Sequence, residues 1–114
     1  MTISDIAKKI DGRIVCSEEK STEEVEYAFS SDLMSDVLKV DRENVLLITG
    51  LANLQAIRTS EMSEINCIVF ARDKKINNEI IKLAEETGIV LIESPFSVFR
   101  ISGELYSAGI KPLF

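Results

Sequence analysis

The chain has 114 residues, of which 46% are apolar and 28% are charged, as expected for one soluble globular domain. Its 13 basic and 19 acidic residues give a formal net charge of −6, which argues against nucleic acids and anionic membrane surfaces as partners. The sequence has no histidine, so the commonest general base and metal ligand is excluded. No apolar run reaches the length of a membrane span and no signal-peptide layout is found, so we expect a cytoplasmic location.

The first third of the chain predicts a helix, two short strands and a second helix. Apolar residues recur at helical spacing over residues 4–10. Residues 13–16 are a short apolar strand candidate, and a polar loop follows over 18–24. Apolar and other residues alternate over 25–29, which indicates a half-buried strand. We then expect a helix over 33–38, with its cap supplied by Ser30, Ser31 and Asp32.

The most regular feature is a set of three apolar runs rich in β-branched residues. They begin at positions 45, 67 and 89, so they are 22 residues apart each time. Short uninterrupted runs of this kind are typical of strands buried on both faces of a parallel sheet. The spacing leaves room for one helix between successive strands. We therefore predict an α/β fold, with a mostly parallel sheet of four to five strands flanked by helices.

Helix caps fit the segments between and after these strands. Asn53 precedes a helical pattern over 54–62, and Asn77 or Asn78 precedes another over 79–86. Gly88 stands where a helix C-terminal glycine belongs. The dipeptide Ser94-Pro95 predicts the start of a last helix, with proline at its first position. Five residues are expected to line that helix: Phe96, Phe99, Ile101, Leu105 and Tyr106.

A candidate site follows from this topology, because ligands of open α/β sheets bind beyond the carboxyl ends of the strands. Each of those ends leads into a predicted helix N-terminus, where backbone N–H groups favour an anion. The only dense basic cluster, which begins at Arg72, lies at one of these ends. A phosphate-bearing small molecule is therefore the predicted ligand. Its candidate binding residues are Ser30, Ser31, Asp32, Thr49, Gly50, Asn53, Arg72 and Ser94. The alternative is that these residues only cap helices and form turns, with the charged loop facing water.

Little in the sequence points to catalysis, a metal or a cofactor. No phosphate loop of the GxxxxGK[ST] type and no GxGxxG motif occurs. Asp32 and Asp36 are one helical turn apart and are the only candidates for an acid–base pair or a cation site, although such pairs are common on surfaces. Cys16 and Cys67 are isolated in apolar contexts, so we expect both to be buried thiols rather than ligands.

Three segments carry a resemblance to a known family. The run Ala28-Phe29-Ser30-Ser31-Asp32-Leu33-Met34-Ser35-Asp36-Val37-Leu38, the run Leu46-Leu47-Ile48-Thr49-Gly50, and the stretch from Ile80 to Phe99 resemble DRTGG-type domains. The resemblance covers nearly the whole chain and implies one domain over 1–114. It also implies a fold similar to the N-terminal domain of HPr kinase/phosphorylase and to the regulatory domain of some phosphotransacetylases. Such domains are non-catalytic, sense small molecules or carry regulation, and tend to pair.

The chain departs from the residues that give the family its name. Ala52-Asn53 stands where the family often has Asp-Arg, and Ala71-Arg72-Asp73 stands where it often has Thr-Gly-Gly. We expect a non-catalytic regulatory domain that senses a nucleotide or phosphorylated molecule. The alternative is a protein interaction module, a homodimer that docks a partner and binds no ligand. Leu113 and Phe114 also need cover, from a second copy or from within the chain.

Overall fold

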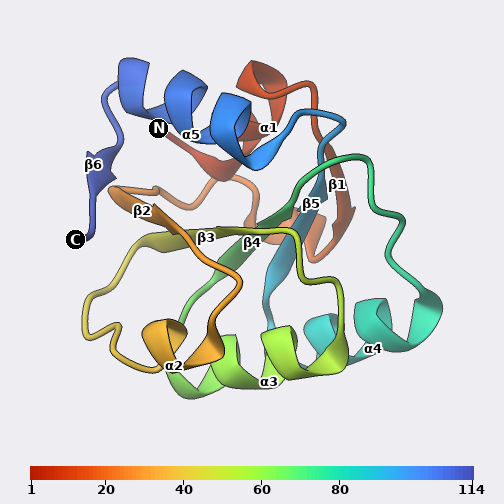
Figure 1. Cartoon of the computed structure of the whole chain (residues 1–114). Coiled ribbons are helices and arrows are strands. Elements are labelled where there is room, and N and C mark those ends of the chain that lie inside the picture. Colours follow the sequence, from red (N-terminus) through yellow and green to blue (C-terminus); the bar gives the residue numbers. More distant parts are fainter.

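The computed structural model describes residues 1–114 and contains one six-stranded sheet (Figure 1). The strand order is β1-β5-β4-β3-β2-β6, and only β1 runs antiparallel to its neighbour. The strands are β1 Arg13–Cys16, β2 Tyr27–Ser30, β3 Val45–Thr49, β4 Cys67–Phe70, β5 Val90–Glu93 and β6 Lys111–Pro112.

Helices cover both faces of the sheet. Helices α2, α3 and α4 lie on one face, while α1 and α5 lie on the other (Figure 1). The helices are α1 Ile3–Lys9, the short 3₁₀ helix η1 Glu18–Lys20, α2 Met34–Val37, α3 Leu54–Met62, α4 Asn78–Thr87 and α5 Val98–Ser107. This arrangement confirms the predicted α/β class. None of these helices combines the length and the apolar character that crossing a lipid bilayer requires.

The three apolar runs form the centre of the sheet, as predicted. β3, β4 and β5 are parallel neighbours, and every residue in them is buried. Alternate side chains point to opposite faces, so Leu47 packs toward the α2–α4 face and Ile48 toward the α1–α5 face. Burial of each such side chain contributes roughly 1.5–3 kcal/mol. Double-sided burial therefore explains why these runs contain no charge before their last residue.

The predicted strand count of four to five was too low, because β6 was not foreseen. This strand has two residues and pairs in parallel with β2, and Leu113 N–H donates to Ala28 O at 3.1 Å. The Leu113 side chain packs against the core, and the Phe114 ring meets Phe29 edge-on at 5.6 Å. The chain itself thus covers part of the apolar C-terminal pair, which was one of the two alternatives.

Two of the predicted helix caps are wrong. Helix α2 begins after Leu33 with no side-chain cap, because Asp32 points instead at the end of β3. Helix α5 begins at Val98 and is capped by Ser97 rather than by Ser94. Of the residues expected to line α5, Phe99 and Tyr106 project into solvent.

Other local predictions are confirmed. Asn53 caps α3, Asn77 caps α4, and Gly88 ends α4 in the left-handed conformation. Cys16 and Cys67 are free and buried on opposite faces of the sheet. Burial raises the pKa of both thiols, which keeps them protonated and unreactive.

Candidate ligand site at the carboxyl edge of the sheet

A hollow of about 490 Å³ lies beyond the carboxyl ends of the parallel strands. It combines the end of β2, the loop after β4 and the start of α5, and its lining residues are Ser30, Ser31, Asp32, Arg72, Ser97, Val98 and Phe99. Four of the eight predicted site residues are in this set. Three segments far apart in sequence therefore meet at the edge where ligands of open α/β sheets bind.

Asp32, an exposed residue in the lining of the hollow, is held by two hydrogen bonds from the end of β3. Its Oδ1 accepts hydrogen bonds from Thr49 Oγ1 at 2.7 Å and from Gly50 N–H at 2.8 Å. The Thr49 hydrogen bond, then that of Gly50, lowers the pKa of this carboxyl group below its usual value, and Arg72 and Lys74 lower it further. Asp32 is therefore an ionised carboxylate with one oxygen engaged by the protein.

Arg72 is a free cation beside that carboxylate. Its guanidinium lies against Gly50, where an added Cβ would be 3.0 Å from Nη2. Arg72 takes part in none of the ion pairs of the protein. An arginine without a protein partner retains all its N–H donors for a carboxylate or phosphate ligand.

The backbone around Arg72 is strained. Arg72 has φ +63° and Asp73 has φ +57°, so two consecutive non-glycine residues adopt the left-handed conformation. For L-residues this conformation costs roughly 1–2 kcal/mol each. Strain of this kind persists where the surrounding structure enforces it, and it is concentrated at functional sites.

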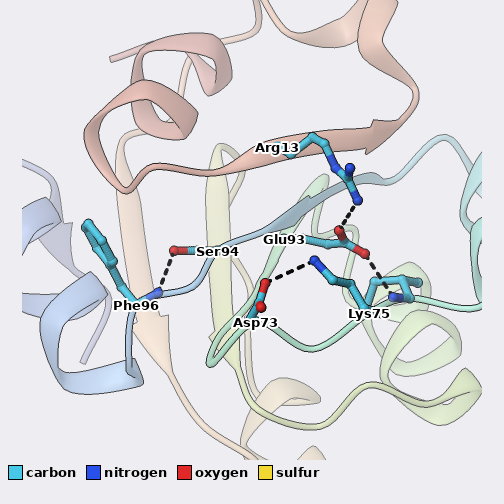
Figure 2. Close-up of polar contacts among 7 residues, drawn as sticks. Arg13, Asp73, Lys75, Glu93, Ser94 and Phe96 are labelled. Atoms are coloured by element: carbon cyan, nitrogen blue, oxygen red, sulfur yellow. Dashed lines mark hydrogen bonds and ion pairs between the residues drawn. The ribbon is translucent and has the colours of Figure 1, made fainter.

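Hydrogen bonds to the residues at and just after the end of β5 hold the strained loop in place. Arg72 N–H donates to Phe96 O and Asp73 N–H donates to Ser94 O, both at 2.8 Å. Glu93, only 6% exposed, accepts from Ile76 N–H at 2.9 Å and from the Arg13 guanidinium at 2.6 Å (Figure 2). The buried Glu93 carboxylate thus ties β1, β5 and the loop carrying Arg72 together.

The hydroxyl groups of the hollow are not equivalent. Ser102 donates its single proton to Val98 O at 2.7 Å, so Ser30 must be the donor in the 2.6 Å contact between Ser30 and Ser102. Ser30 is therefore left as an acceptor toward a ligand. Ser31 accepts from Leu33 N–H at 3.0 Å, and its own donor contacts are 3.4 Å long. Such long contacts are weak, so the Ser31 proton is available.

The N-terminus of α5 forms the opposite wall. Ser97 Oγ accepts from Arg100 N–H at 3.1 Å, which leaves the Ser97 proton free. The N–H groups of Val98 and Phe99 have no acceptor within the protein. Together with the helix dipole, these donors make this wall favourable for an anion.

The other four predicted residues support the site from below or lie outside it. Thr49 and Gly50 are buried beneath the hollow, where they hold Asp32. Asn53 uses its side chain to cap α3. Ser94 is fully buried, and its hydroxyl donates to Ile10 O and accepts from Phe96 N–H. Asn53 and Ser94 are therefore occupied by structural hydrogen bonds.

Sequence reasoning missed Ser97, Val98, Phe99 and Glu93. A signal for the first three was present: an apolar residue before a helix cap often packs on the fourth helical residue, and Phe96 and Ile101 flank Ser97 with that spacing. No sequence pattern indicated that Glu93 would be buried. A charged residue directly after an apolar strand is usually exposed at the surface.

Asp32 and Asp36 do not act as a pair in this arrangement. Asp36 accepts from Ser31 and lies 3.7 Å from Lys39 Nζ, whereas Asp32 faces Thr49 and Gly50. No group of three or more acidic or cysteine side chains has the arrangement of a metal site.

Comparison with known proteins agrees with this fold. A sequence profile of the DRTGG domain matches residues 5–108. The chain belongs to the DRTGG domain family. HPr kinase/phosphorylases from three strains of Streptococcus agalactiae are 34% identical over 61 residues, which are 54% of this chain and 20% of those proteins. The match thus spans about a fifth of the relatives' length.

A solved structure of a DRTGG domain has the same fold. It contains the CBS and DRTGG domains of the regulatory region of Clostridium perfringens pyrophosphatase, complexed with the activator diadenosine tetraphosphate. The TM-score is 0.71 at 14% identity, over 91% of this chain and 45% of that one.

The structure also explains a departure from the DRTGG pattern. Arg72 and Asp73, which the resemblance aligns with two glycines of the DRTGG pattern, are the two residues of the loop with positive φ. The loop thus has a conformation suited to glycine while carrying a guanidinium. This chain accepts backbone strain at the position where it places a cation.

Proposed function

We propose that residues 1–114 act as one regulatory domain that binds a nucleotide or another phosphorylated small molecule at the carboxyl edge of the sheet. The observation that carries this proposal is the unpartnered Arg72 guanidinium in the hollow beside the α5 N-terminus. The ligand's phosphate would accept from Arg72, the Ser97 hydroxyl and the free N–H groups of α5. The nucleotide activator of the Clostridium perfringens regulatory region supports a nucleotide as the first ligand class to test.

The proposed activity is binding without turnover. No histidine is available to activate the serine hydroxyls of the hollow, and the contact of Ser31 with the Asp36 carboxylate is long at 3.4 Å. Asp32 is committed to Thr49 and Gly50 through one oxygen and stays ionised. A site that offers charged and hydrogen-bonding groups without a short proton-transfer contact is suited to recognition rather than catalysis.

A thermal-shift screen against nucleotides and phosphorylated metabolites tests this function. A ligand at about 100 times its dissociation constant adds about 2.7 kcal/mol of stability, or about 10 °C in melting temperature for a domain of this size. Arg72→Ala should remove the shift, whereas Arg58→Ala, at an exposed arginine on α3, should keep it. Equal shifts in both variants would contradict the proposed site.

A second candidate function is protein docking, beginning with homodimer formation. The outer face of α5 favours it, because Phe99 is 89% exposed and Tyr106, about two helical turns later on the same face, is 70% exposed. Gly103 lies between them, with no atom within 4 Å of an added Cβ. Tyr106→Glu tests this function without touching the hollow: a fall in molecular mass by light scattering would support a dimer, and an unchanged monomeric mass would remove it.

A further inference from the structure

We propose that Asp32 recognises a hydroxyl group of the ligand, so that the ligand contains a phosphorylated ribose, as a ribonucleotide does. This inference rests on the proposed function, because it assigns a second contact within the same hollow. It concerns the half of the site that faces away from the phosphate.

The first step is the unused half of the Asp32 carboxylate. Oδ1 takes both hydrogen bonds from the protein, whereas Oδ2 accepts none. The two bonds to Oδ1 come from the buried end of β3, so they fix where Oδ2 points. A preorganised acceptor loses little entropy on binding a hydroxyl donor.

The second step is the space between Asp32 and Arg72. A Cβ placed on Gly50 would lie 3.7 Å from Asp32 Oδ2 and 3.0 Å from Arg72 Nη2. The two side chains nevertheless form no ion pair within 4.0 Å. The absence of a Cβ on Gly50 therefore lets the Arg72 guanidinium lie close to the backbone beside Asp32, with both side chains still free to contact a ligand.

The third step is the pattern of donors and acceptors around Asp32 and Arg72. Ser30 is restricted to accepting, because its proton goes to Ser102. The β2 end of the hollow therefore offers two acceptors, Ser30 Oγ and Asp32 Oδ2, beside the Ser31 hydroxyl, whose proton is also available. Arg72 and the α5 N-terminus offer only donors. The complementary ligand has hydroxyl donors on one side and an anionic group on the other.

Ribose 5-phosphate has this combination in one unit, with neighbouring hydroxyls and a phosphate at the other end of the sugar. A carboxylate accepting from a ribose hydroxyl is also how dinucleotide-binding folds hold the sugar. A divalent cation is a poorer fit, because it needs several oxygen ligands and no cluster of three acidic groups exists here.

Matched ligand pairs test the assignment on the 114-residue chain by titration calorimetry. The probes are ATP, 2′-deoxy-ATP and 3′-deoxy-ATP, together with ribose 5-phosphate, 2-deoxyribose 5-phosphate and inorganic phosphate. Removal of the recognised hydroxyl should weaken binding about ten- to a hundredfold, as expected for one hydrogen bond to a charged group.

Two variants connect this preference to the residues. Asp32→Asn keeps an oxygen for Thr49 and Gly50 but replaces the carboxylate, so the preference for the hydroxyl should fall to near unity while phosphate binding persists. Gly50→Ala has no positive φ to strain, and its Cβ would displace the Arg72 guanidinium, so it should weaken sugar phosphates and inorganic phosphate alike while leaving the hydroxyl preference unchanged. Urea unfolding of both variants establishes that they are folded.

The outcomes separate this inference from the proposed function. Equal affinity of wild type for the ribose and all deoxyribose forms, with binding still lost in Arg72→Ala, overturns the role of Asp32 alone. Binding that requires Mg²⁺ and shows no hydroxyl preference assigns Asp32 to a cation and also overturns it. Failure of every probe, phosphate included, overturns both proposals.

Discussion

The two edges of the parallel strands carry hollows of similar size and different charge. The carboxyl edge has about 490 Å³ and includes Arg72, whereas the amino edge has about 440 Å³ and is lined by Glu43, Glu61 and Glu64 with no basic residue. Helix N-termini also face the carboxyl edge, because each parallel strand leads into the start of a helix. Volume therefore does not distinguish the two edges, whereas side-chain charge and backbone dipoles together favour an anion at the carboxyl edge alone.

Both edges also contain non-glycine residues in the left-handed conformation, for different reasons. Glu64, with φ +59°, follows the last turn of α3, where this conformation commonly ends a helix. Arg72 and Asp73 instead lie between β4 and α4, held by hydrogen bonds to residues 93–96. Strain at the amino edge thus has a local cause, and strain at the carboxyl edge is imposed by tertiary contacts.

The largest expected effect on stability comes from Glu93. Glu93→Ala leaves the Ile76 N–H without an acceptor in a buried location and Arg13 without its partner, so we expect a loss of about 2–3 kcal/mol. Arg13 is 71% exposed, so the lost N–H acceptor is the main cause. Glu61→Ala at the amino edge should change stability by no more than about 0.5 kcal/mol. Urea unfolding measures both, and similar small losses would show that Glu93 does not hold the loop.

A smaller effect of opposite sign is expected from glycine at the strained positions. Arg72→Gly relieves the left-handed backbone and should stabilise the domain by about 0.5–1 kcal/mol after the entropic cost of glycine. The same variant should abolish phosphate binding. Glu64→Gly should stabilise to a similar extent and leave binding unchanged. A destabilised Arg72→Gly would mean that the loop is not strained, and retained binding would mean that Arg72 is not the anion ligand.

The smallest effect concerns acid stability at the carboxyl edge. The Thr49 hydroxyl and the Gly50 N–H lower the pKa of Asp32 in the folded state. Its contribution to stability is therefore present above the unfolded pKa of about 3.9 and is lost as the pH falls through the lower folded pKa. Asp32→Asn should flatten the decline in urea midpoint below about pH 4. A decline as steep as that of wild type would show that Asp32 gains no stability from these hydrogen bonds.

Local sequence patterns predicted some elements well because the physical cause was local. Asn53 and Asn77 cap their helices through bonds to a residue three positions later, and Gly88 ends α4 by its own backbone freedom. The cap of α5 was predicted at Ser94 because proline at the first helical position is common. Ser94 is buried against Ile10 O instead, a contact between residues 84 positions apart that no local rule contains.

Four of the eight residues predicted for the candidate site line the hollow. Ser30, Ser31, Asp32 and Arg72 were found because strand ends are visible in the sequence and lie at one edge of a parallel sheet. Asn53 and Ser94 are strand-end residues too, yet structural hydrogen bonds occupy them. Ser97 lines the hollow and Glu93 holds the loop that carries Arg72. Both roles depend on contacts with segments distant in the sequence, which local spacing does not predict.

The class of the fold and its central strands follow from the amino-acid sequence, because burial on both faces requires uninterrupted apolar runs and the helices between them require regular spacing. Contacts between distant segments instead set the pairing of β6 with β2, the turn of Asp32 to Thr49 rather than to the start of α2, and the unpaired state of Arg72. These outcomes depend on which of several available hydrogen-bond partners comes within reach. That choice is made by the packing of segments distant in the chain.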